Sequence, residues 1–512
     1  MKLLILTINL FFYLECKCSE ILYIQQMPSY SHYILCDKIV KGLLAKGHRV
    51  TLISPYSQKT QVENLKEIPL TKLKEESEAI KDKVDPTTFQ NTFMSLVFDG
   101  GKHVLEDENV QKEIFKPGLH FDLIIIHKFG EELLTGLSYH FKAPYILLST
   151  IGQSFVGSMQ VGLPGVPAYL PDFLINISPE MCFFQRLINT VIIDSMLIYG
   201  YFFHFRKLDN DMQKFFPGAP SVSDLYFNVS LYLWNSHPSY GFSLPSVPNA
   251  IDVGGFHVSD PKPLPKDLKT ILDGAKDGAI FFSLGSNVRA FSLPNETKDG
   301  ILKSFSKLKQ VVLWKFEDPE LPNKPKNVHI SKWYPQQDIL AHPNVKLFIT
   351  HGGLLSLTEA VYNGVPIIGI PVFGDQFYNV EEAVKQGYAY KVLYNEMNEK
   401  NFDKAIGEML NNKKYYENMK EKSRVFHDRP VKPLDSTIYW IEYVIRHRGA
   451  PHLRSITANL SWIQLQLLDV YATLLVLLFI AFKCIQIVIR KIVNKICNCK
   501  SSKKEKTIKK TQ

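Results

Sequence analysis

Residues 347–376 read LFITHGGLLSLTEAVYNGVPIIGIPVFGDQ, and they carry the clearest fold pattern in the chain. It begins with an apolar run that ends at Thr350, passes through His351-Gly352-Gly353, and continues at helical spacing through Glu359. A second apolar run follows at 366–370. Short continuous apolar runs are typical of strands buried on both faces of a parallel sheet. The stretch therefore predicts a strand–helix–strand unit of an α/β fold.

Similar apolar runs lie in both halves of the chain. The expected strands are 21–24, 50–53, 123–126 and 145–148 in the first half, and 279–284 and 311–315 in the second. A helical pattern at 34–45 completes a β-loop-α-β unit with a right-handed crossover. A proline-rich segment, 245–265, reads as a linker. The sequence predicts two α/β domains, 20–244 and 266–455, with ligands beyond the carboxyl ends of their strands.

The first 19 residues have the features of a secretory signal peptide. Lys2 precedes an apolar run at 3–14, and small or polar residues follow at 16–19. The run is too short to span a bilayer. A buried first strand is the alternative for this segment.

A longer apolar segment, 467–489, lies near the C-terminus and is interrupted by Asp469, Lys483 and Gln486. At about 1.5 Å per residue it is long enough to cross a hydrocarbon core of about 30 Å, so we expect a transmembrane helix rather than a buried core helix. The tail, 490–512, holds nine Lys or Arg and one acid, which is +8 of the formal net charge of +9. The positive-inside rule then places the tail in the cytosol and the domains in the lumen.

Charge and cysteine usage exclude several classes of protein. Because the chain before the tail is nearly neutral, we expect no nucleic-acid-binding face. Cys36 and Cys182 are the only lumenal cysteines, so neither a disulfide framework nor a metal cluster is indicated. Lys509-Lys510 resembles the dilysine retrieval signal of endoplasmic-reticulum membrane proteins. Sequons at Asn176, Asn228, Asn295 and Asn459 offer glycosylation sites.

The segment 183–205 is apolar on nearly all sides and leaves two interpretations open. A helix of this kind is buried in a protein core, or it forms the wall of a site for a lipophilic molecule or dips into a membrane. The sequence favours neither interpretation.

The window 333–376 carries the pattern that points to function. It contains Trp333, Gln336, His351-Gly352-Gly353, Ser356, Glu359, Pro366, Pro371 and Asp375-Gln376. This pattern resembles the signature of the UDP-glycosyltransferase family, which includes the UDP-glucuronosyltransferases. The segments 30–32, 282–286 and 433–447 extend the resemblance over essentially the whole chain, and 137–149 looks like an insect-type member. The resemblance implies a GT-B fold: two Rossmann-like domains facing a cleft, a return helix at the end of the second, and a transmembrane helix.

The chemistry of a nucleotide sugar fits these residues. Trp333 offers a flat face to uracil, and base–aromatic stacking contributes about 1–3 kcal/mol. His351 and Gly353 precede a helix, whose free N–H groups and dipole favour the diphosphate. Ser286, at the end of another strand, can add a donor. We therefore expect the UDP-sugar to bind at Ser286, Trp333, Gln336, His351, Gly353, Ser356, Glu359, Asp375 and Gln376.

The resemblance implies further roles within this set. Glu359 is expected to bind the ribose hydroxyls, and Asp375 and Gln376 the sugar hydroxyls. One residue departs from the pattern, because Leu355 stands where many relatives carry Asn. Either one phosphate hydrogen bond is lost or the backbone supplies it.

His32 matches the catalytic histidine of the family and is expected in the loop after the first strand. A histidine suits the removal of a proton from an acceptor hydroxyl near neutral pH. Relatives orient this histidine with an Asp at the position of His127. The orienting group is therefore His127, Glu131 or Glu132, or it is absent. We assign His32 and His127 as the catalytic pair.

These residues predict an inverting UDP-hexosyltransferase that needs no metal ion and lies in the endoplasmic-reticulum membrane. No cofactor is expected, because the UDP-sugar is a co-substrate. Its expected partners are a UDP-sugar, a small lipophilic acceptor and the bilayer, with a homo-oligomer left open. The choice between glucose and glucuronate also stays open. The alternatives are a metal-dependent transferase that uses Asp209-Asn210-Asp211, and a lipophile-binding membrane protein impaired in catalysis by the change at His127.

Overall fold

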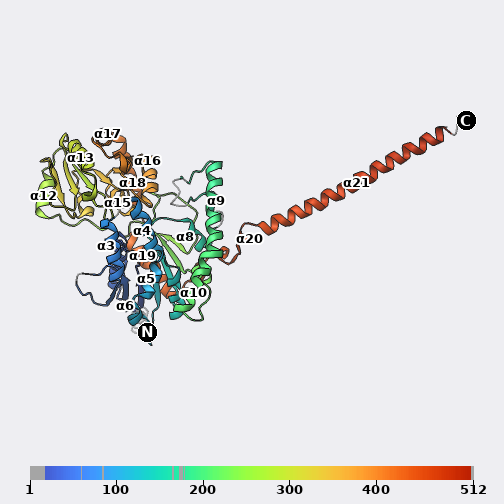
Figure 1. Cartoon of the computed structure of the whole chain (residues 1–512), viewed down its shortest axis with the longest axis horizontal. Helices are drawn as coiled ribbons and strands as arrows, with labels where there is room; N and C mark the ends of the chain where they lie inside the picture. Colours follow the sequence, from blue (N-terminus) through green and yellow to red (C-terminus); the bar gives the residue numbers. More distant parts are fainter. Residues whose placement is uncertain are drawn as a thin grey trace, which may run out of the picture. The chain divides into compact units, whose positions relative to one another are not determined.

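The computed structural model describes residues 18–58, 60–83, 86–163, 166–171, 177 and 179–508, with the side chains of 81–83, 86–91, 462 and 497–508 left out. Most of the predicted signal peptide, the sequon at Asn176 and the lysine pair at 509–510 lie outside these residues. The chain forms two compact units that divide after Ser455. The first unit contains both sheets (Figure 1).

The first sheet has seven parallel strands in the order β3-β2-β1-β4-β5-β6-β7. The strands are β1 Glu20–Ile24, β2 Arg49–Ser54, β3 Leu65–Pro69, β4 Leu123–His127, β5 Tyr145–Ser149, β6 Leu231–Trp234 and β7 Ala250–Asp252. Strands β4, β5 and β6 are buried along their whole length, as their continuous apolar runs require. Strand β7 lies inside the segment 245–265, which the sequence predicts as a linker, and it completes this sheet.

The second sheet repeats the same topology. Its six parallel strands follow the order β10-β9-β8-β11-β12-β13. The strands are β8 Ala279–Ser283, β9 Val311–Lys315, β10 Val328–Ser331, β11 Val345–Thr350, β12 Ile367–Gly369 and β13 Ala389–Lys391. In each sheet the strand order reverses beside the first strand, between β1 and β4 and between β8 and β11. Ligands of doubly wound sheets bind at such switch points.

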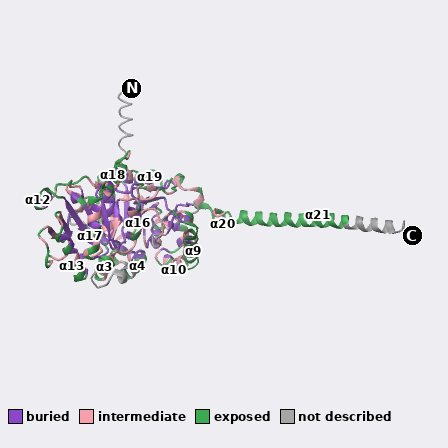
Figure 2. Cartoon of the chain, turned by 90° about the horizontal axis from the view of Figure 1, so that it is seen from above, coloured by how far each residue is buried: buried purple, intermediate pink, exposed green. Residues whose placement is uncertain are grey.

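Helices cover both faces of each sheet (Figure 1). Those of the first half are α2 Tyr30–Ala45, α3 Thr71–Lys83, α4 Pro86–Phe98, α5 Gly100–Glu106, α6 Glu108–Ile114, α7 Gly136–Phe141, α8 Phe155–Gln160, α9 Phe183–Tyr199, α10 Phe205–Phe215 and α11 Val222–Tyr226. Those that follow are α12 Lys266–Asp273, α13 Asn295–Ser306, α14 Gln336–Leu340, α15 Leu354–Asn363, α16 Gln376–Lys385, α17 Glu399–Asn411, α18 Lys413–His427 and α19 Pro433–Arg446. The buried residues concentrate in the sheets and on the inner faces of these helices (Figure 2).

The last helix of this unit, α19, returns to the first half, as the sequence resemblance implies. Ile438, Ile441 and Val444 are buried in the same apolar cluster as the strands β1 and β2. A Cβ atom at Gly42 on α2 would come within 2.8 Å of the Ile438 side chain, so glycine there lets α2 and α19 approach without displacing Ile438. The return helix thus ties the end of the second half to the first sheet.

The second unit contains α20 Trp462–Leu465 and α21 Leu468–Ile508. The first part of α21, Leu468–Ile496, is fully exposed and has the length and apolar composition to cross a membrane. This helix contains residues 468–489 of the predicted span 467–489 and fits a single-pass anchor. A second helical segment, Phe183–Phe215, passes the same test of length and composition, although one of its sides packs on the first unit.

Candidate active site

A cavity opens in the first unit beyond the carboxyl ends of β1, β8 and β11. It is the location that the two switch points predict. The cavity brings together ten of the eleven predicted site residues: His32, Ser286, Trp333, Gln336, His351, Gly353, Ser356, Glu359, Asp375 and Gln376. The remaining residue, His127, is fully buried next to His32 rather than in the cavity wall.

His351 is held between two glycines at the end of β11. A side chain at Gly285 would lie 2.5 Å from the His351 ring, and one at Gly353 would lie 2.7 Å from it. Both glycines therefore make room for the imidazole as well as for a ligand. Gly353 is also the N-cap of α15, so the free N–H groups of that helix open into the cavity. Burial, aided by the Lys315 ammonium, lowers the pKa of His351 to about 4.

Trp333 has a largely free indole ring at the edge of the cavity. The side chain is 57% exposed. The ring of Tyr30, from the first half, meets it edge-on with the centroids 5.7 Å apart, and the Lys315 ammonium lies 5.8 Å from its centroid. An exposed aromatic face beside a helix N-terminus is suited to a nucleotide base.

Replacing Trp333 by alanine should weaken UDP binding. The expected loss is the stacking contribution of about 1–3 kcal/mol, or about 5- to 150-fold in Kd. Calorimetry with UDP measures it, and Phe291→Ala, another exposed aromatic of the second half outside the cavity, is the control. An unchanged Kd in Trp333→Ala would show that the indole does not take part in UDP binding.

Glu359 is the centre of a buried polar network on α15. Gln336 donates to its Oε2 at 2.6 Å and also to Ser356 Oγ at 3.0 Å. Gln337 donates to Oε1 at 3.0 Å, and His257 Nε2 lies 3.7 Å from the same oxygen. Burial raises the pKa of Glu359 to about 7. Sequence reasoning missed Gln337 and His257, because a second Gln and a histidine in a proline-rich segment carry no signal of their own.

The raised pKa of Glu359 predicts that donor binding depends on pH near neutrality. The Glu359 carboxylate, which is expected to accept the ribose hydroxyls, is mostly ionised above pH 7 and mostly protonated below it. If only the ionised form binds, affinity for UDP-glucose should fall roughly tenfold between about pH 8 and pH 6. UDP-glucose is the suitable ligand because its diphosphate does not titrate in this range, and calorimetry at each pH gives the Kd.

Glu359→Gln is the matched variant for this measurement, since it keeps the shape of the side chain and removes the titration. Its Kd should be weaker and flat across the same range. His32 and His351, with pKa values near 4, stay neutral throughout and do not contribute. An equally steep pH dependence in Glu359→Gln would assign the titration to another group.

Asp375 and Gln376 lie at the start of α16, after β12. Gln376 Oε1 accepts the backbone N–H groups of Val372 and Phe373 at 2.9 and 3.1 Å, so this side chain holds the preceding loop in place. Asp375 accepts a hydrogen bond from Asn379 at 2.7 Å, and burial raises the pKa of Asp375. The two residues reach the cavity together.

His32 lies in the first turn of α2, not in the preceding loop as the sequence predicts. The helix begins at Tyr30, earlier than the expected 34, with Ser29 as its N-cap. Ser29 also accepts a hydrogen bond from Asn287 of the second half at 3.2 Å. Burial lowers the pKa of His32 to about 4, so its imidazole is neutral and able to accept a proton at neutral pH. Its Nδ1 has no hydrogen-bond partner among the described residues.

His127, at the end of β4, is the candidate neighbour of His32. The two ring centroids are 6.3 Å apart. Its Nε2 shares a hydrogen bond of 2.9 Å with the Tyr23 hydroxyl, and Gln26 donates to its carbonyl at 2.8 Å. Burial, followed by the proximity of His32, lowers the pKa of His127 well below the usual range, so this imidazole is neutral.

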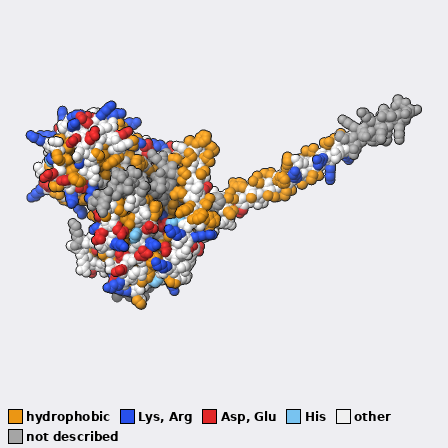
Figure 3. Space-filling view, viewed as in Figure 1, with side chains coloured by type: hydrophobic (Ala, Val, Ile, Leu, Met, Phe, Trp, Pro, Cys, Tyr) orange, Lys and Arg blue, Asp and Glu red, His pale blue; other side chains and the backbone are white. Residues whose placement is uncertain are grey.

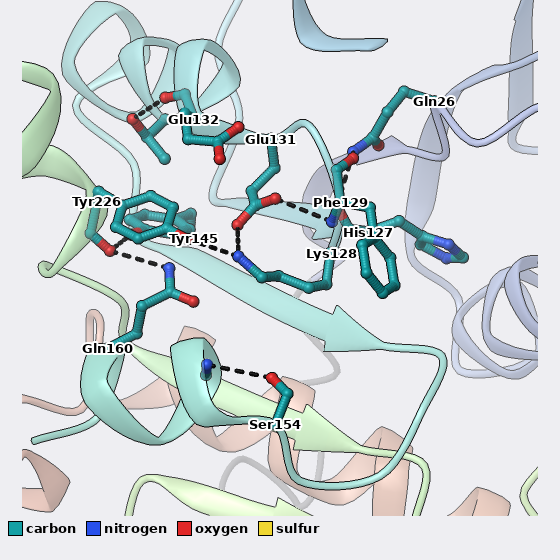
Figure 4. Close-up of polar contacts among 12 residues, drawn as sticks. Gln26, His127, Lys128, Phe129, Glu131, Glu132, Tyr145, Ser154, Gln160 and Tyr226 are labelled. Atoms are coloured by element: carbon teal, nitrogen blue, oxygen red, sulfur yellow. Dashed lines mark hydrogen bonds and ion pairs between the residues drawn. The ribbon is translucent and has the colours of Figure 1, made fainter. Parts of the chain in front are cut away.

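Glu131 and Glu132, the two other candidates, contact different groups. Glu131 is buried and pairs with Lys128, and it accepts the backbone N–H of Phe129 at 2.9 Å. Figure 4 shows Lys128 pointing to the side of the chain opposite to His127, towards Glu131 and the Tyr226 hydroxyl. Glu132 lies 3.8 Å from His204. Among the three candidates, His127 is the one whose side chain contacts His32.

The cavity also has an apolar wall. Met27, Phe93 and Phe129 from the first half pack together with Phe373 from the second, and all four line the cavity. Phe129 has a φ of +95°, a region that non-glycine residues rarely occupy, so its backbone is strained. Leu355, in place of the expected Asn, also lines the cavity. Sequence reasoning missed this wall because its residues are far apart in the chain.

The alternative metal motif lies away from this cavity. Asp209 and Asp211 are on α10, and neither lines the cavity. Asp209 accepts the backbone N–H of Val222 at 2.7 Å, and Asp211 lies 3.9 Å from Lys102. Asp209 thus fixes the turn before α11, which is a structural role.

Solved structures with the same arrangement of sheets are glycosyltransferases. The glycosyltransferase of kitacinnamycin matches with a TM-score of 0.59 at 16% identity, over 84% of this chain and 100% of that one. The calicheamicin glycosyltransferase CalG4 matches with a TM-score of 0.59 at 15% identity, over 85% and 100%. At such low identity these likenesses establish the fold alone, which is GT-B.

The sequence has closer relatives of known name. UDP-glucosyltransferase 2 of the insect Dactylopius coccus is 38% identical over 90% of both chains. Human UDP-glucuronosyltransferase 2B15 is 31% identical over 87% of this chain and 88% of its own. Residues 21–499 match the family model described as "UDP-glucoronosyl and UDP-glucosyl transferase". The chain belongs to this family and is a UDP-hexosyltransferase.

Proposed function

We propose that this enzyme transfers a glucosyl or glucuronosyl group from a UDP-sugar to a hydroxyl group of a small lipophilic acceptor, with inversion and without a metal ion. The observation that carries the proposal is the position of His32. It lies in one cavity with the apolar wall of Met27, Phe93 and Phe129 and with the nucleotide residues of the second half. An apolar acceptor on that wall would place its hydroxyl between the histidine and the sugar.

In the proposed step the acceptor oxygen attacks the anomeric carbon while the bond from that carbon to UDP breaks. His32 accepts the hydroxyl proton, and UDP leaves with the bonding electrons. The N-terminus of α15, at Gly353, stabilises the charge on the leaving diphosphate. This fixed source of positive potential supports a step that needs no divalent cation.

A single displacement is supported by the state of the carboxylates in the cavity. In the described part of the chain, Glu359 and Asp375 are the acidic residues that line it. Glu359 accepts hydrogen bonds from two glutamines, and Asp375 accepts one from Asn379. Carboxylates engaged in this way are poor nucleophiles for a covalent sugar intermediate, which leaves the acceptor as the attacking group.

We propose a positioning role for His127. A neutral imidazole cannot stabilise the His32 imidazolium as a carboxylate would. Its hydrogen bond to Tyr23 and its burial instead fix a rigid surface behind the His32 ring. With this role for His127 the protein can still catalyse transfer. A lipophile-binding protein that has lost catalysis would not.

The decisive experiment is an assay of the full-length protein in microsomes. UDP-glucose and UDP-glucuronate are each supplied with a panel of phenols, and UDP and glycoside are quantified together. The proposal expects equal amounts of UDP and glycoside with at least one donor, also in the presence of a chelator. Binding of both ligands without consumption of the UDP-sugar would show that the protein binds lipophiles without catalysing transfer. Loss of turnover with the chelator would show that the reaction requires a metal ion.

We also propose that the first unit lies in the lumen of the endoplasmic reticulum and the tail 490–512 in the cytosol. The support is the +8 charge of the tail directly after the apolar part of α21. In sealed microsomes, protease should remove a C-terminal epitope and spare residues 20–460. Degradation of residues 20–460 without detergent would show that the orientation is the opposite of the proposed one.

A further inference from the structure

Two ring nitrogens lie buried and unpartnered beside the cavity. The Nδ1 atoms of His32 and His127 are both inaccessible, and neither has a hydrogen-bond partner among the described residues. Buried polar atoms in folded proteins are nearly always hydrogen-bonded, to protein or to an ordered water. Two such atoms on neighbouring rings therefore point to one group that serves both.

The spacing of the two rings fits a water molecule between these nitrogens. The ring centroids of His32 and His127 are 6.3 Å apart, and the ring planes are inclined by 46°. A direct N–H···N hydrogen bond would bring two imidazole centroids to about 5.2 Å or less. One bridging water, about 2.8 Å from each nitrogen, allows the centroids to be up to about 6.7 Å apart. A buried water needs at least two polar partners, and the two Nδ1 atoms supply them.

The other nitrogen of each ring faces a different neighbour. His127 Nε2 shares a hydrogen bond of 2.9 Å with the Tyr23 hydroxyl, which leaves Nδ1 on the side of the ring away from Tyr23. His32 lines the cavity. Because its Nδ1 is inaccessible, Nε2 is the nitrogen that an acceptor hydroxyl can reach. His32 thus has one nitrogen for the acceptor and one for a partner inside the protein.

The carboxylates that follow His127 in the chain do not supply that partner. Glu131 pairs with Lys128, and Glu132 lies 3.8 Å from His204. Figure 3 shows charged side chains spread over the outer face of the first unit, whereas His127 is fully buried. Of the candidates that the sequence offers, the neutral ring of His127 is left as the partner of His32.

From these observations we propose that a buried water joins His32 Nδ1 to His127 Nδ1, and that His127 is a positioning residue for the base through this water. The inference rests on the proposed function, because it takes His32 as the base. The hydrogen on His32 Nδ1 is donated to the water, and the water donates to His127 Nδ1. His127 Nε2 then carries a hydrogen and donates it to the Tyr23 oxygen. The Tyr23 hydroxyl can donate in turn to the Cys36 sulfur, to which it is hydrogen-bonded.

This chain of hydrogen bonds keeps His32 in the tautomer that a base needs. With the hydrogen fixed on Nδ1, Nε2 is free to take the acceptor proton as the acceptor oxygen attacks the sugar. His32 then becomes an imidazolium, whose Nδ1–H is a stronger donor, so its bond to the water strengthens as the charge develops. After UDP leaves, Nε2 releases the proton to the solvent in the cavity. No proton passes through His127, which keeps both of its hydrogen bonds throughout.

Asparagine and glutamine at position 127 separate the two nitrogens of the imidazole. The amide group of asparagine occupies roughly the place of Nδ1, and that of glutamine roughly the place of Nε2. His127→Asn therefore keeps a polar group for the water and gives up the contact with Tyr23. His127→Gln keeps the contact with Tyr23 and gives up the water. The two variants are matched in chemistry and differ in which nitrogen they replace.

The test measures kcat and KM for a phenol, and the Kd for UDP, in the solubilised full-length protein. His127→Gln should have a kcat about 5- to 150-fold below that of His127→Asn, because it leaves the Nδ1–H of the imidazolium buried without a partner. KM and Kd should agree between the two variants, since His127 is not part of the cavity wall. Circular dichroism checks that both variants keep the wild-type fold.

Tyr23→Phe keeps the comparison valid if His127→Asn destabilises the chain by leaving the Tyr23 hydroxyl unpaired. Added to both variants, it removes that hydroxyl, and the same ratio of kcat is expected. Equal kcat in the two variants, or a higher kcat in His127→Gln, would overturn the proposal, since contact with Tyr23 or simple packing would then be what His127 supplies. Wild-type protein that turns over neither UDP-sugar would contradict the proposed function itself, a result distinct from either ratio.

Discussion

His32→Ala should lower kcat by about 10²- to 10⁴-fold, the usual contribution of a general base, while the Kd for UDP stays unchanged. The loss arises because the neighbouring imidazole cannot take over as the base: His127 is buried behind His32 and bonded to Tyr23. The residues expected to bind the nucleotide belong to the second half, so UDP binding should not respond. Steady-state kinetics with a phenol acceptor and calorimetry with UDP measure the two quantities.

His120→Ala is the control, since His120 is an exposed histidine of the first half and contacts Asp122 at 3.2 Å. The pH profile adds a second readout. Burial lowers the pKa of His32 to about 4, so its neutral form prevails above that pH. At UDP-sugar concentrations that saturate the enzyme, so that the titration of Glu359 does not limit donor binding, kcat/KM for the phenol should show an acid limb near pH 4 rather than near 6.5. Wild-type turnover in His32→Ala would overturn the assignment of the base.

Glu131→Ala should lower the free energy of unfolding by about 3–5 kcal/mol, because it leaves the Lys128 ammonium buried without its charged partner. Both side chains are nearly inaccessible, and Lys128 is otherwise bonded only to the Tyr226 hydroxyl at 2.6 Å among the hydrogen bonds described. The change also removes the acceptor for the Phe129 N–H, which holds the strained backbone of that residue. Acceptor KM should therefore rise as well. Chemical denaturation gives the stability.

The matched variant is Lys128→Met with Glu131→Gln. It removes both charges, and the glutamine oxygen can still accept the Phe129 N–H. Replacing a buried ion pair by neutral groups is often close to neutral for stability, so this double variant should recover most of the loss. Equal destabilisation in the single and double variants would show that the loss of stability comes from altered side-chain packing and not from the unpaired charge of Lys128.

The interior strands could be predicted from sequence because burial on both faces leaves a continuous apolar run, as at Leu123–Ile126 or Val311–Lys315. Edge strands carry no such signal. In β3, Leu65–Pro69, Ile68 is the only buried side chain, and the edge strand β13 has just three residues. The exposure of the α9 segment could not be predicted either, since an apolar helix has the same sequence pattern whether it is buried or, as here, largely exposed.

The residues predicted for the donor half lie in one cavity, as expected from their closeness in sequence and from strands whose carboxyl ends meet. The rest depends on contacts between distant segments. Glu359 meets His257 of the proline-rich segment, and Phe129 and Phe373 pack against the same small apolar cluster, through contacts that no local pattern encodes. The start of α2 was missed because the helix begins at Tyr30, before the apolar periodicity that starts at Ile34, and this places His32 in its first turn.

The configuration of the anomeric carbon in the first product tests the proposed mechanism most directly. Proton NMR during turnover of α-linked UDP-glucose with a phenol reports that configuration before any later exchange. Direct attack by an acceptor deprotonated at His32 predicts a β-glycoside from the first turnover. An α-glycoside would require a protein nucleophile or attack from the same face, and it would contradict the single displacement with His32 as its base.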